Sequence, residues 1–329
     1  MLRVTFYSYR GGVGRTLALL NVAAILARQG RKVVAVDLDL EAPGFGLSAM
    51  TRSPEKRLAR GVSELLLERR AGENMNLEAD VYSYPVLQPH CGDNLWLMPA
   101  GKRAKELADL VPRLYDDPDD PENRLFDLLV AEIQHRLAPD YLFFDSRTGT
   151  ADIAGVCTLH LPQVVVSVCG LSEQNVAGMA YVLQQMRDFR RQDALPEVAT
   201  LLVLSPVPRL RDERQGRKES RGGRAMVGGD ALLSPEERLL AGRMEEIQRR
   251  IVAPMLQELG PGLPSFPHLR PQDLVHELEY DPLVPVTGDL QLTRASRLSE
   301  QYRELAMSIA RASTTDAELV PMDVPWDGP

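Results

Sequence analysis

The sequence has few cysteines and lacks any long apolar run. Its three cysteines, Cys91, Cys157 and Cys169, form no CxxC pair, so neither a disulfide framework nor a cysteine-ligated zinc site is expected. No apolar run approaches the roughly 18 residues that a membrane-spanning helix needs. The N-terminus also lacks the layout of a signal peptide. These absences predict a cytoplasmic protein whose thiols are reduced and buried.

Positive charge is also in short supply. The 329 residues include 38 Lys and Arg against 46 Asp and Glu, which gives a formal net charge of −8. That balance argues against a surface that binds DNA or anionic lipid as a whole. The five histidines have no metal-ligand spacing. The remaining composition, 44% hydrophobic and 26% charged, is that of an ordinary globular protein, so local motifs must indicate the function.

Short apolar runs alternate with longer segments of helical pattern. The runs are rich in β-branched residues and almost continuously apolar, which is typical of strands buried on both faces of a parallel sheet. The alternation predicts an α/β protein with a doubly wound, mostly parallel sheet, helices on both faces and ligands at the carboxyl ends of the strands. The predicted strands are 2–8, 32–38, 94–100, 141–146, 163–170 and 199–205. The predicted helices are about 16–29, 62–71, 122–137, 174–192, 235–259 and 293–312.

A glycine-rich loop follows the first predicted strand. In the segment SYRGGVGRT, residues 8–16, three glycines precede Arg15 and Thr16. Glycines allow the backbone to turn tightly and to aim its N–H groups at an anion, and the N-terminus of the following helix adds partial positive charge. A hydroxyl directly after the basic residue suits a magnesium ligand. This context predicts a phosphate-binding loop, and a tight turn without a ligand is the alternative.

The loop resembles the deviant phosphate loop, KGGxGK(S/T), of the ParA/MinD family of P-loop ATPases. Arg10 stands where the family has its signature lysine, and Arg15 stands at the second lysine. The glycines and Thr16 match directly. The resemblance implies bound ATP and Mg²⁺, with the nucleotide held by Arg10, Gly11, Gly12, Val13, Gly14, Arg15, Thr16 and Leu17.

Two arginines in place of two lysines change the expected chemistry. Arginine is larger, planar and forked, and it binds phosphate well, even with two hydrogen bonds. Nucleotide binding is therefore expected, while the rate of hydrolysis stays open. In the family the signature lysine reaches across an ATP-bound dimer to the partner's nucleotide. Arg10 in that position resembles an arginine finger, and a solvent-facing loop charge is the alternative.

Carboxylates follow the second predicted strand, in the segment VVAVDLDLEAPGFG. Asp37 and Asp39 are two residues apart, and in an extended segment such side chains point to the same side. The resemblance implies that Asp39 orients the attacking water near Mg²⁺ and that Asp37 supports the loop, since phosphoryl transfer needs mostly positioning and charge stabilisation. Glu41, Pro43 and Gly44 form a candidate switch loop. An acidic strand end that caps a turn is the alternative.

A third carboxylate, Asp145, ends the apolar run YLFFD. An aspartate at this place is typical of the Walker B motif, and Ser146 and Gly149 match the D-(S/T)-x-x-G of the family. Arg147 is unusual beside a phosphate site, and a contact with the nucleotide, with a partner subunit or with solvent alone is equally open for it. The resemblance implies a magnesium site formed by Thr16, Asp39 and Asp145.

The resemblance covers about residues 1–205 and 270–312. We expect one P-loop ATPase domain over 1–315 with a charged loop insertion at about 206–234, followed by an extended tail over 316–329.

Two segments leave specificity open. Ser205 stands where the family has an asparagine for adenine recognition, so the base is not settled. Residues 209–224 hold seven basic and three acidic side chains. A solvated loop, a protein-binding site and a nucleic-acid contact are all open for this segment, which lacks the interleaved aromatics of a stacking surface.

These observations favour a slow, Mg²⁺-dependent ATPase that acts as a nucleotide-dependent dimerisation switch. It would be a homodimer when ATP is bound and would recruit or regulate an unidentified protein partner. The expected catalytic residues are Asp39, Arg10 and Arg15. One alternative is a dimeric nucleotide-binding module with little or no hydrolysis. Another is a DNA-partitioning ATPase, although the charge balance disfavours nonspecific DNA. The acidic, proline-containing tail disfavours recruitment to a membrane.

Overall fold

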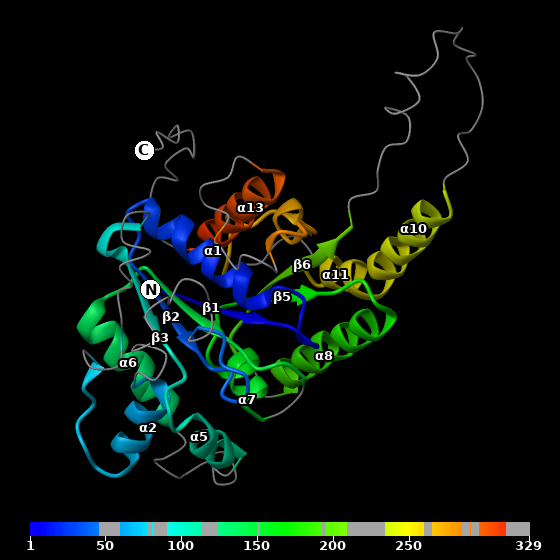
Figure 1. The fold of residues 1–329 in the computed structure, drawn as a ribbon. Coiled ribbons are helices and arrows are strands. Elements are labelled where there is room, and N and C mark those ends of the chain that lie inside the picture. The colour runs from blue at the N-terminus through cyan, green and yellow to red at the C-terminus, as the bar shows by residue number, and fades with distance from the viewer. Residues whose placement is uncertain are drawn as a thin grey trace, which may run out of the picture.

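The computed structural model describes residues 1–45, 60–77, 81, 91–112, 124–149, 152–192, 195–208, 234–259, 265–284, 290 and 296–313. A parallel sheet forms its centre, and helices cover both faces of that sheet (Figure 1). Most of the expected charged insertion and the whole expected tail lie outside the described residues.

Seven strands pair in the order β3-β2-β4-β1-β5-β6-β7, and every neighbouring pair is parallel. This arrangement confirms the predicted doubly wound α/β fold. The six apolar runs form six of the strands because they can be buried on both faces of the sheet. The strands are β1 (Leu2–Tyr7), β2 (Val33–Asp37), β3 (Leu95–Met98), β4 (Tyr141–Asp145), β5 (Val164–Cys169), β6 (Ala199–Val207) and β7 (Val275–Glu279).

The helices follow the predicted segments closely, but one predicted helix is divided and two short α-helices, α5 and α7, were not predicted. The segment 235–259 is divided into α10 and α11 by a π-helical turn, Gln248–Val252. The other π-helical turn, Val156–His160, follows the one-turn helix α7 (Asp152–Gly155). The longer helices are α1 (Arg15–Arg28), α2 (Val62–Arg70), α5 (Ala104–Leu110), α6 (Leu125–Leu137), α8 (Glu173–Gln192), α10 (Pro235–Ile247), α11 (Ala253–Leu259) and α13 (Arg297–Arg311).

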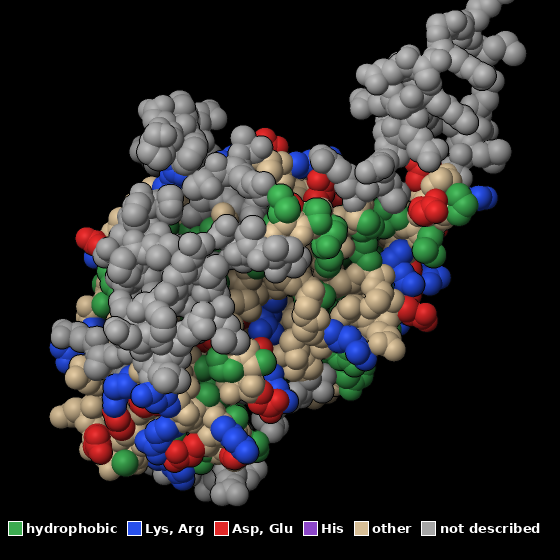
Figure 2. All heavy atoms as spheres, viewed as in Figure 1, with side chains coloured by type: hydrophobic (Ala, Val, Ile, Leu, Met, Phe, Trp, Pro, Cys, Tyr) green, Lys and Arg blue, Asp and Glu red, His purple; other side chains and the backbone are tan. Residues whose placement is uncertain are grey.

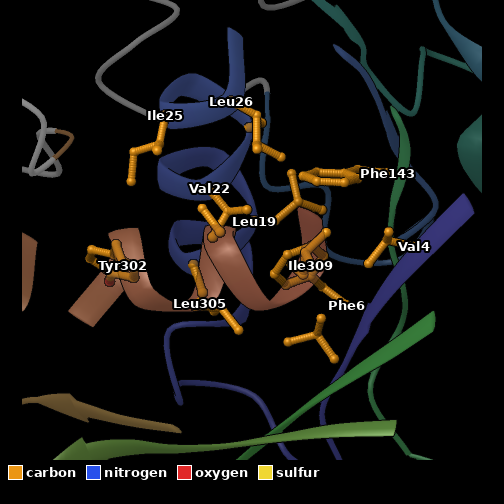
Figure 3. Packing of buried hydrophobic residues seen from close by; sticks show 14 of the residues in the cluster. Val4, Phe6, Leu19, Val22, Ile25, Leu26, Phe143, Tyr302, Leu305 and Ile309 are labelled. Carbon is orange, nitrogen blue, oxygen red and sulfur yellow. The ribbon is translucent and has the colours of Figure 1, made fainter. Parts of the chain in front are cut away.

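Apolar side chains hold the helices on the two faces of the sheet. On one face, α1 and α13 pack together over Val4 and Phe6 of β1, with Leu305 and Ile309 of α13 fully buried (Figure 3). Each fully buried side chain of this size contributes about 1.5–3 kcal/mol to folding. On the other face, α2, α5 and α6 cover the half of the sheet that contains β2, and α8 covers β5 and β6. None of the described helices is long and apolar enough to cross a bilayer.

The strand order brings the predicted motifs to one edge of the sheet. β1 lies between β4 and β5, so the chain that leaves β1 enters the crevice where helices depart to opposite faces. Asp37 and Asp145 are register partners and are the last residues of β2 and β4. The glycine loop and two of the three carboxylates therefore meet at the carboxyl edge because of topology, over more than a hundred residues of sequence.

Candidate functional site

The glycine loop leaves its backbone open at the carboxyl edge of the sheet. Gly12 and Gly14 have φ angles of 78° and 82°, a left-handed conformation that favours glycine. A Cβ at Gly11 or Gly12 would meet no atom within 4 Å. Helix α1 begins at Arg15 with no side-chain cap and no acidic residue in its first turn. The free N–H groups of that turn, together with the open space over the loop, suit an anion such as phosphate.

The Arg15 side chain is buried and bonds to two carboxylates. Its Nε donates to Asp145 Oδ1 at 2.6 Å, and its Nη2 donates to Asp39 Oδ2 at 2.7 Å. Arg15 is 7% exposed, and its Nη1 is buried without a hydrogen-bond partner. Burial lowers the pKa of Arg15, but the charges and hydrogen bonds of Asp145 and Asp39 outweigh burial and raise this pKa above its ordinary value. One guanidinium thus joins two carboxylates from different strand ends.

The hydroxyl of Thr16 completes the hydrogen bonds of Asp145. Thr16 Oγ1 donates to Asp145 Oδ2 at 2.6 Å, so both oxygens of this fully buried carboxylate accept a hydrogen bond. Burial raises the pKa of Asp145 above its ordinary value, although Arg15 and Thr16 act in the opposite direction. The predicted magnesium ligands Thr16, Asp39 and Asp145 are therefore brought together, with Arg15 bonded to two of them.

Asp37 holds the turn that follows β2. Its carboxylate accepts the N–H groups of Asp39 at 3.1 Å, Gly44 at 2.9 Å and Phe45 at 3.0 Å. Burial, followed by the charge of Asp145, raises the pKa of Asp37 well above its ordinary value. Asp39 lies two residues beyond the end of β2, and its N–H is held by the Asp37 carboxylate. Residues 39–45 then turn around Asp37.

The candidate switch residues pack directly on the loop helix. A Cβ at Gly44 would lie 2.8 Å from Thr16 Cγ2, so the backbone of the turn rests on the Thr16 side chain. Glu41 pairs with Arg147 at 2.6 Å, which links this turn to the segment after β4. This ion pair lies within the chain, so it is none of the three contacts left open for Arg147. Pro43 is half-buried in the turn.

The remaining predicted residues divide between the surface and the interior. Arg10 and Gly11 are exposed, Val13 is buried beside Gly170, and Leu17 is half-buried. Ser146 is buried, and its N–H donates to Phe6 O at 3.0 Å, which fixes the start of the segment after β4.

Ser205 lies next to the glycine loop. Its Oγ is 3.5 Å from the place where a Gly14 side chain would begin. The residue that stands at the family's asparagine position is therefore close to the loop.

Sequence reasoning missed two tyrosines beside the loop. Tyr7 is fully buried, and its hydroxyl donates to Gly149 O at 2.9 Å, holding the segment after β4 against β1. The ring of Tyr9 packs on Gly178 of α8, where a Cβ would lie 2.1 Å from the ring. A glycine inside a helical pattern signals such a close approach, so Gly178 could have indicated the contact. Tyr7 carried no comparable signal.

The residues present fit a nucleotide with Mg²⁺. In the described part of the chain no group of three or more His, Cys, Asp and Glu side chains is arranged to hold a metal ion. Mg²⁺, however, takes few protein ligands and keeps phosphate and water oxygens. The hydroxyl of Thr16 and the carboxylates of Asp39 and Asp145 are hard oxygen ligands of this kind. The N–H groups of the open glycine loop beside them suit the phosphates.

Comparisons with known proteins agree with this geometry. Residues 4–54 match the model of the CobQ/CobB/MinD/ParA nucleotide binding domain. The protein VirC1 of Rhizobium rhizogenes is 35% identical over 88 residues, which are 27% of this chain and 36% of VirC1. The match therefore spans only about a third of the length of this curated relative.

Solved structures resemble the whole chain at low identity. The cell division ATPase MinD of Pyrococcus furiosus has a TM-score of 0.54 at 17% identity, with 94% of this chain and 98% of MinD covered. The ATP complex of a McdA variant from Cyanothece has a TM-score of 0.56 at 14% identity, with 95% of each chain covered. Identities this low show the fold.

The fold and its glycine loop define an α/β protein of the P-loop NTPase class. Within that fold, residues 4–54 are similar to the CobQ/CobB/MinD/ParA nucleotide binding domain, which is the resemblance that the loop indicated.

Proposed function

We propose that the chain binds ATP with Mg²⁺ at the carboxyl edge of the sheet and acts as a nucleotide-dependent switch. In this proposal it is a slow ATPase that forms a homodimer when ATP is bound and recruits or regulates a protein partner. One observation carries the proposal: the open glycine loop lies beside Thr16, Asp39 and Asp145. The family match over residues 4–54 supports the choice of a nucleotide as the ligand.

Each group at this edge has a role in the proposal. The N–H groups of residues 11–17 would bind the phosphates, and Thr16 with Asp145 would hold Mg²⁺. When bound, Mg²⁺ would neutralise the charge that develops on the transferred phosphoryl group. Asp39 would orient the attacking water, because its carboxylate lies at the same edge and is fixed by Ala42 N–H at 3.3 Å. The exposed Arg10 would reach a nucleotide held by the second subunit.

The turn over residues 39–45 supports a switch. Its backbone is tied to Asp37, its Gly44 rests on Thr16, and its Glu41 pairs with Arg147. A phosphate and metal at Thr16 would therefore act directly on the turn. Because the turn lies on the surface beside the loop, its conformation would report the nucleotide to a partner.

A binding module without hydrolysis is the second candidate, and the position of Arg15 favours it. The guanidinium at the loop-lysine position is bonded to two carboxylates. If it stays there, it gives no charge stabilisation to the transferred phosphoryl group.

DNA partitioning rests on the basic segment 209–224, which lies outside the described residues. On the face shown in Figure 2, basic and acidic side chains are interspersed over the described part.

Single-turnover phosphate release tests the ATPase, with nucleotide binding measured in parallel. We expect binding of ATP with Mg²⁺ and slow release of phosphate, and we expect Asp39→Asn to lower the release rate about 100-fold. Binding without release would support the second candidate, whereas equal release by Asp39→Asn would remove Asp39 from the reaction.

Molar mass measured by light scattering tests the dimer. The mass should double when a nonhydrolysable ATP analogue and Mg²⁺ are added, and Arg10→Ala should remain monomeric while it still binds the analogue. A dimer that forms equally well with Arg10→Ala would show that Arg10 does not cross the interface.

A further inference from the structure

We propose that Arg15 is an internal counter-ion that keeps the Asp39–Asp145 site closed to Mg²⁺ until a nucleotide phosphate draws the guanidinium away. This inference rests on the proposed function, because it concerns how Mg²⁺ and nucleotide gain access to the carboxylates. It goes further by making the entry of metal conditional on the nucleotide, through a residue where the family has lysine.

The hydrogen bonds of Arg15 use the oxygens that a metal would need. Asp145 Oδ1 accepts Arg15 Nε, Asp145 Oδ2 accepts Thr16 Oγ1, and Asp39 Oδ2 accepts Arg15 Nη2. Among the described residues no second basic side chain forms an ion pair with either carboxylate. A divalent cation at these oxygens would therefore face the guanidinium at close range. The two positive charges exclude one another from the same buried site.

The shape of arginine explains why this closure depends on the residue type. Its planar fork presents Nε and Nη2 to two carboxylates that come from different strand ends. A lysine has a single ammonium on a flexible stem, so it would hold the two carboxylates in less fixed directions. The arginine at position 15 thus affects more than phosphate binding. It supplies a cation with two fixed bonds to the carboxylates that the nucleotide-free protein would otherwise bury without a counter-charge.

One nitrogen of Arg15 lacks a hydrogen-bond partner, which favours release of the guanidinium from the carboxylates. Nη1 is buried and has no hydrogen-bond acceptor, which is an unfavourable state for a charged donor. The glycine loop, a few residues back in the chain, is open to an anion. Phosphate oxygens there would offer acceptors to the whole guanidinium. Rotation of Arg15 toward them would free Asp39 and Asp145 together, so phosphate and metal would enter in a coupled step.

Thermal unfolding of the nucleotide-free chain tests this inference without any enzymatic reaction. The unfolding midpoint is measured in EDTA, in millimolar MgCl₂ and in NaCl of equal ionic strength, for the parent chain and for Arg15→Gln. We expect MgCl₂ to leave the parent midpoint within about 1 °C of its value in EDTA. Arg15→Gln should unfold at a lower temperature in EDTA and should recover about 3 °C or more in MgCl₂ but not in NaCl.

Arg190→Gln is the matched control. Arg190 is also a partly buried arginine, but it donates to the carbonyl oxygens of Thr158, Leu159 and Pro196, and no carboxylate of the described residues forms an ion pair with it. Its replacement should lower the midpoint without recovery in MgCl₂. Two results would overturn the inference: a parent midpoint that rises in MgCl₂ as much as that of Arg15→Gln, or an Arg15→Gln midpoint that MgCl₂ does not change.

Arg15→Lys carries the test if Arg15→Gln does not fold. Affinity for a fluorescent ATP analogue is measured with Mg²⁺ and with EDTA, and the ratio of the two dissociation constants reports how strongly Mg²⁺ assists binding. We expect that assistance to be about threefold or more greater in Arg15→Lys than in the parent chain, because the lysine closes the site less firmly. An equal or smaller ratio would contradict the inference.

The two proposals fail in different ways. If MgCl₂ raises the unfolding midpoint of Arg15→Gln but no variant binds the ATP analogue, the proposed counter-ion role of Arg15 is supported and the proposed nucleotide switch is contradicted. If the analogue and Mg²⁺ bind to the parent chain while the rescue is absent, the switch stands and the counter-ion fails.

Discussion

Two buried arginine–aspartate clusters lie at opposite ends of the parallel strands, which we call the carboxyl edge and the amino edge. At the carboxyl edge, Arg15 joins Asp39 and Asp145. At the amino edge, just before β7, Asp273 pairs with Arg311 of α13 and also accepts Arg270 N–H at 3.0 Å. Both clusters use the same pair of residue types, so the comparison isolates what the surroundings add.

The amino-edge cluster fastens a helix to the sheet. Asp273 is 3% exposed, and its partners tie the end of α13 to the segment before β7. The charges of Asp273 and Arg311 balance each other without a ligand. The carboxyl-edge cluster instead gathers oxygens that suit a metal, leaves Arg15 Nη1 without a partner and adjoins the open glycine loop. The two clusters therefore differ in their surroundings, and only the one with Arg15 borders the carboxyl ends of the strands, where ligands bind in open α/β sheets.

The largest effect is expected when the two aspartates are compared for activity. Asp145→Asn should lower single-turnover phosphate release by about 100-fold or more, because it removes a carboxylate proposed to hold Mg²⁺. Asp273→Asn should leave release by the folded protein within about twofold of the parent rate, since it lies at the other edge. Equal losses in both variants would erase the distinction between the clusters.

At the amino-edge cluster we expect a mutation to change the stability of the chain rather than its activity. Asp273→Ala should lower the free energy of unfolding by about 2–3 kcal/mol, because Arg311 is mostly buried and loses its charged partner. Urea unfolding measures this change. Glu279→Gln is the control, because its ion pair with the exposed Arg297 should be worth at most about 1 kcal/mol. A loss for Asp273→Ala no greater than that of the control would show that the cluster does not fasten α13.

Substitution of two glycines by alanine should have smaller effects, on nucleotide affinity at one position and on stability at the other. Gly44→Ala places a methyl group 2.8 Å from Thr16 Cγ2, so the affinity for ATP with Mg²⁺ should fall about tenfold. Gly242→Ala lies in α10, where a Cβ meets no atom within 4 Å, and should stabilise the chain by about 0.5–1 kcal/mol without changing affinity. Calorimetric titration and urea unfolding measure the two effects. Unchanged affinity in Gly44→Ala would mean that the turn does not rest on Thr16 when nucleotide binds.

The smallest effect concerns pH at the amino-edge cluster. His276 is buried with its Nε2 2.9 Å from Asp273 O, and burial lowers the pKa of His276 below its ordinary value of 6.5. The unfolded chain therefore binds this proton more readily, so the free energy of unfolding should decrease as the pH falls through this range. Urea unfolding between about pH 8 and pH 5 should show a shallower decrease in His276→Gln. A steeper decrease in His276→Gln would contradict a lowered pKa of His276 in the folded chain.

Much of the fold follows from the sequence because the central strands are continuous apolar runs. The strand β7 was missed because His276, Glu277 and Glu279 interrupt its apolar residues, as an edge strand permits. The helix predicted over 235–259 is divided by a π-helical turn that leaves no distinct residue pattern.

The residues of the site could be predicted from spacing and from the family resemblance, but their contacts could not. The direction of Arg15 depends on where Asp39 and Asp145 meet, which the strand order decides. Asp39 lies beyond the end of β2, where a hydrogen bond from its N–H to Asp37 fixes the backbone, and spacing alone does not indicate that bond. The support given by Tyr7 also depends on a contact across 142 residues of sequence.

The most direct test of the account is a crystal structure of the chain with a nonhydrolysable ATP analogue and Mg²⁺. The account predicts phosphates over Gly11–Thr16, Mg²⁺ beside Thr16 and Asp145, and Arg15 turned from the carboxylates toward the phosphates. A nucleotide bound elsewhere would contradict the proposed site. A nucleotide and metal bound at the loop with Arg15 still joined to Asp39 and Asp145 would contradict the role of Arg15.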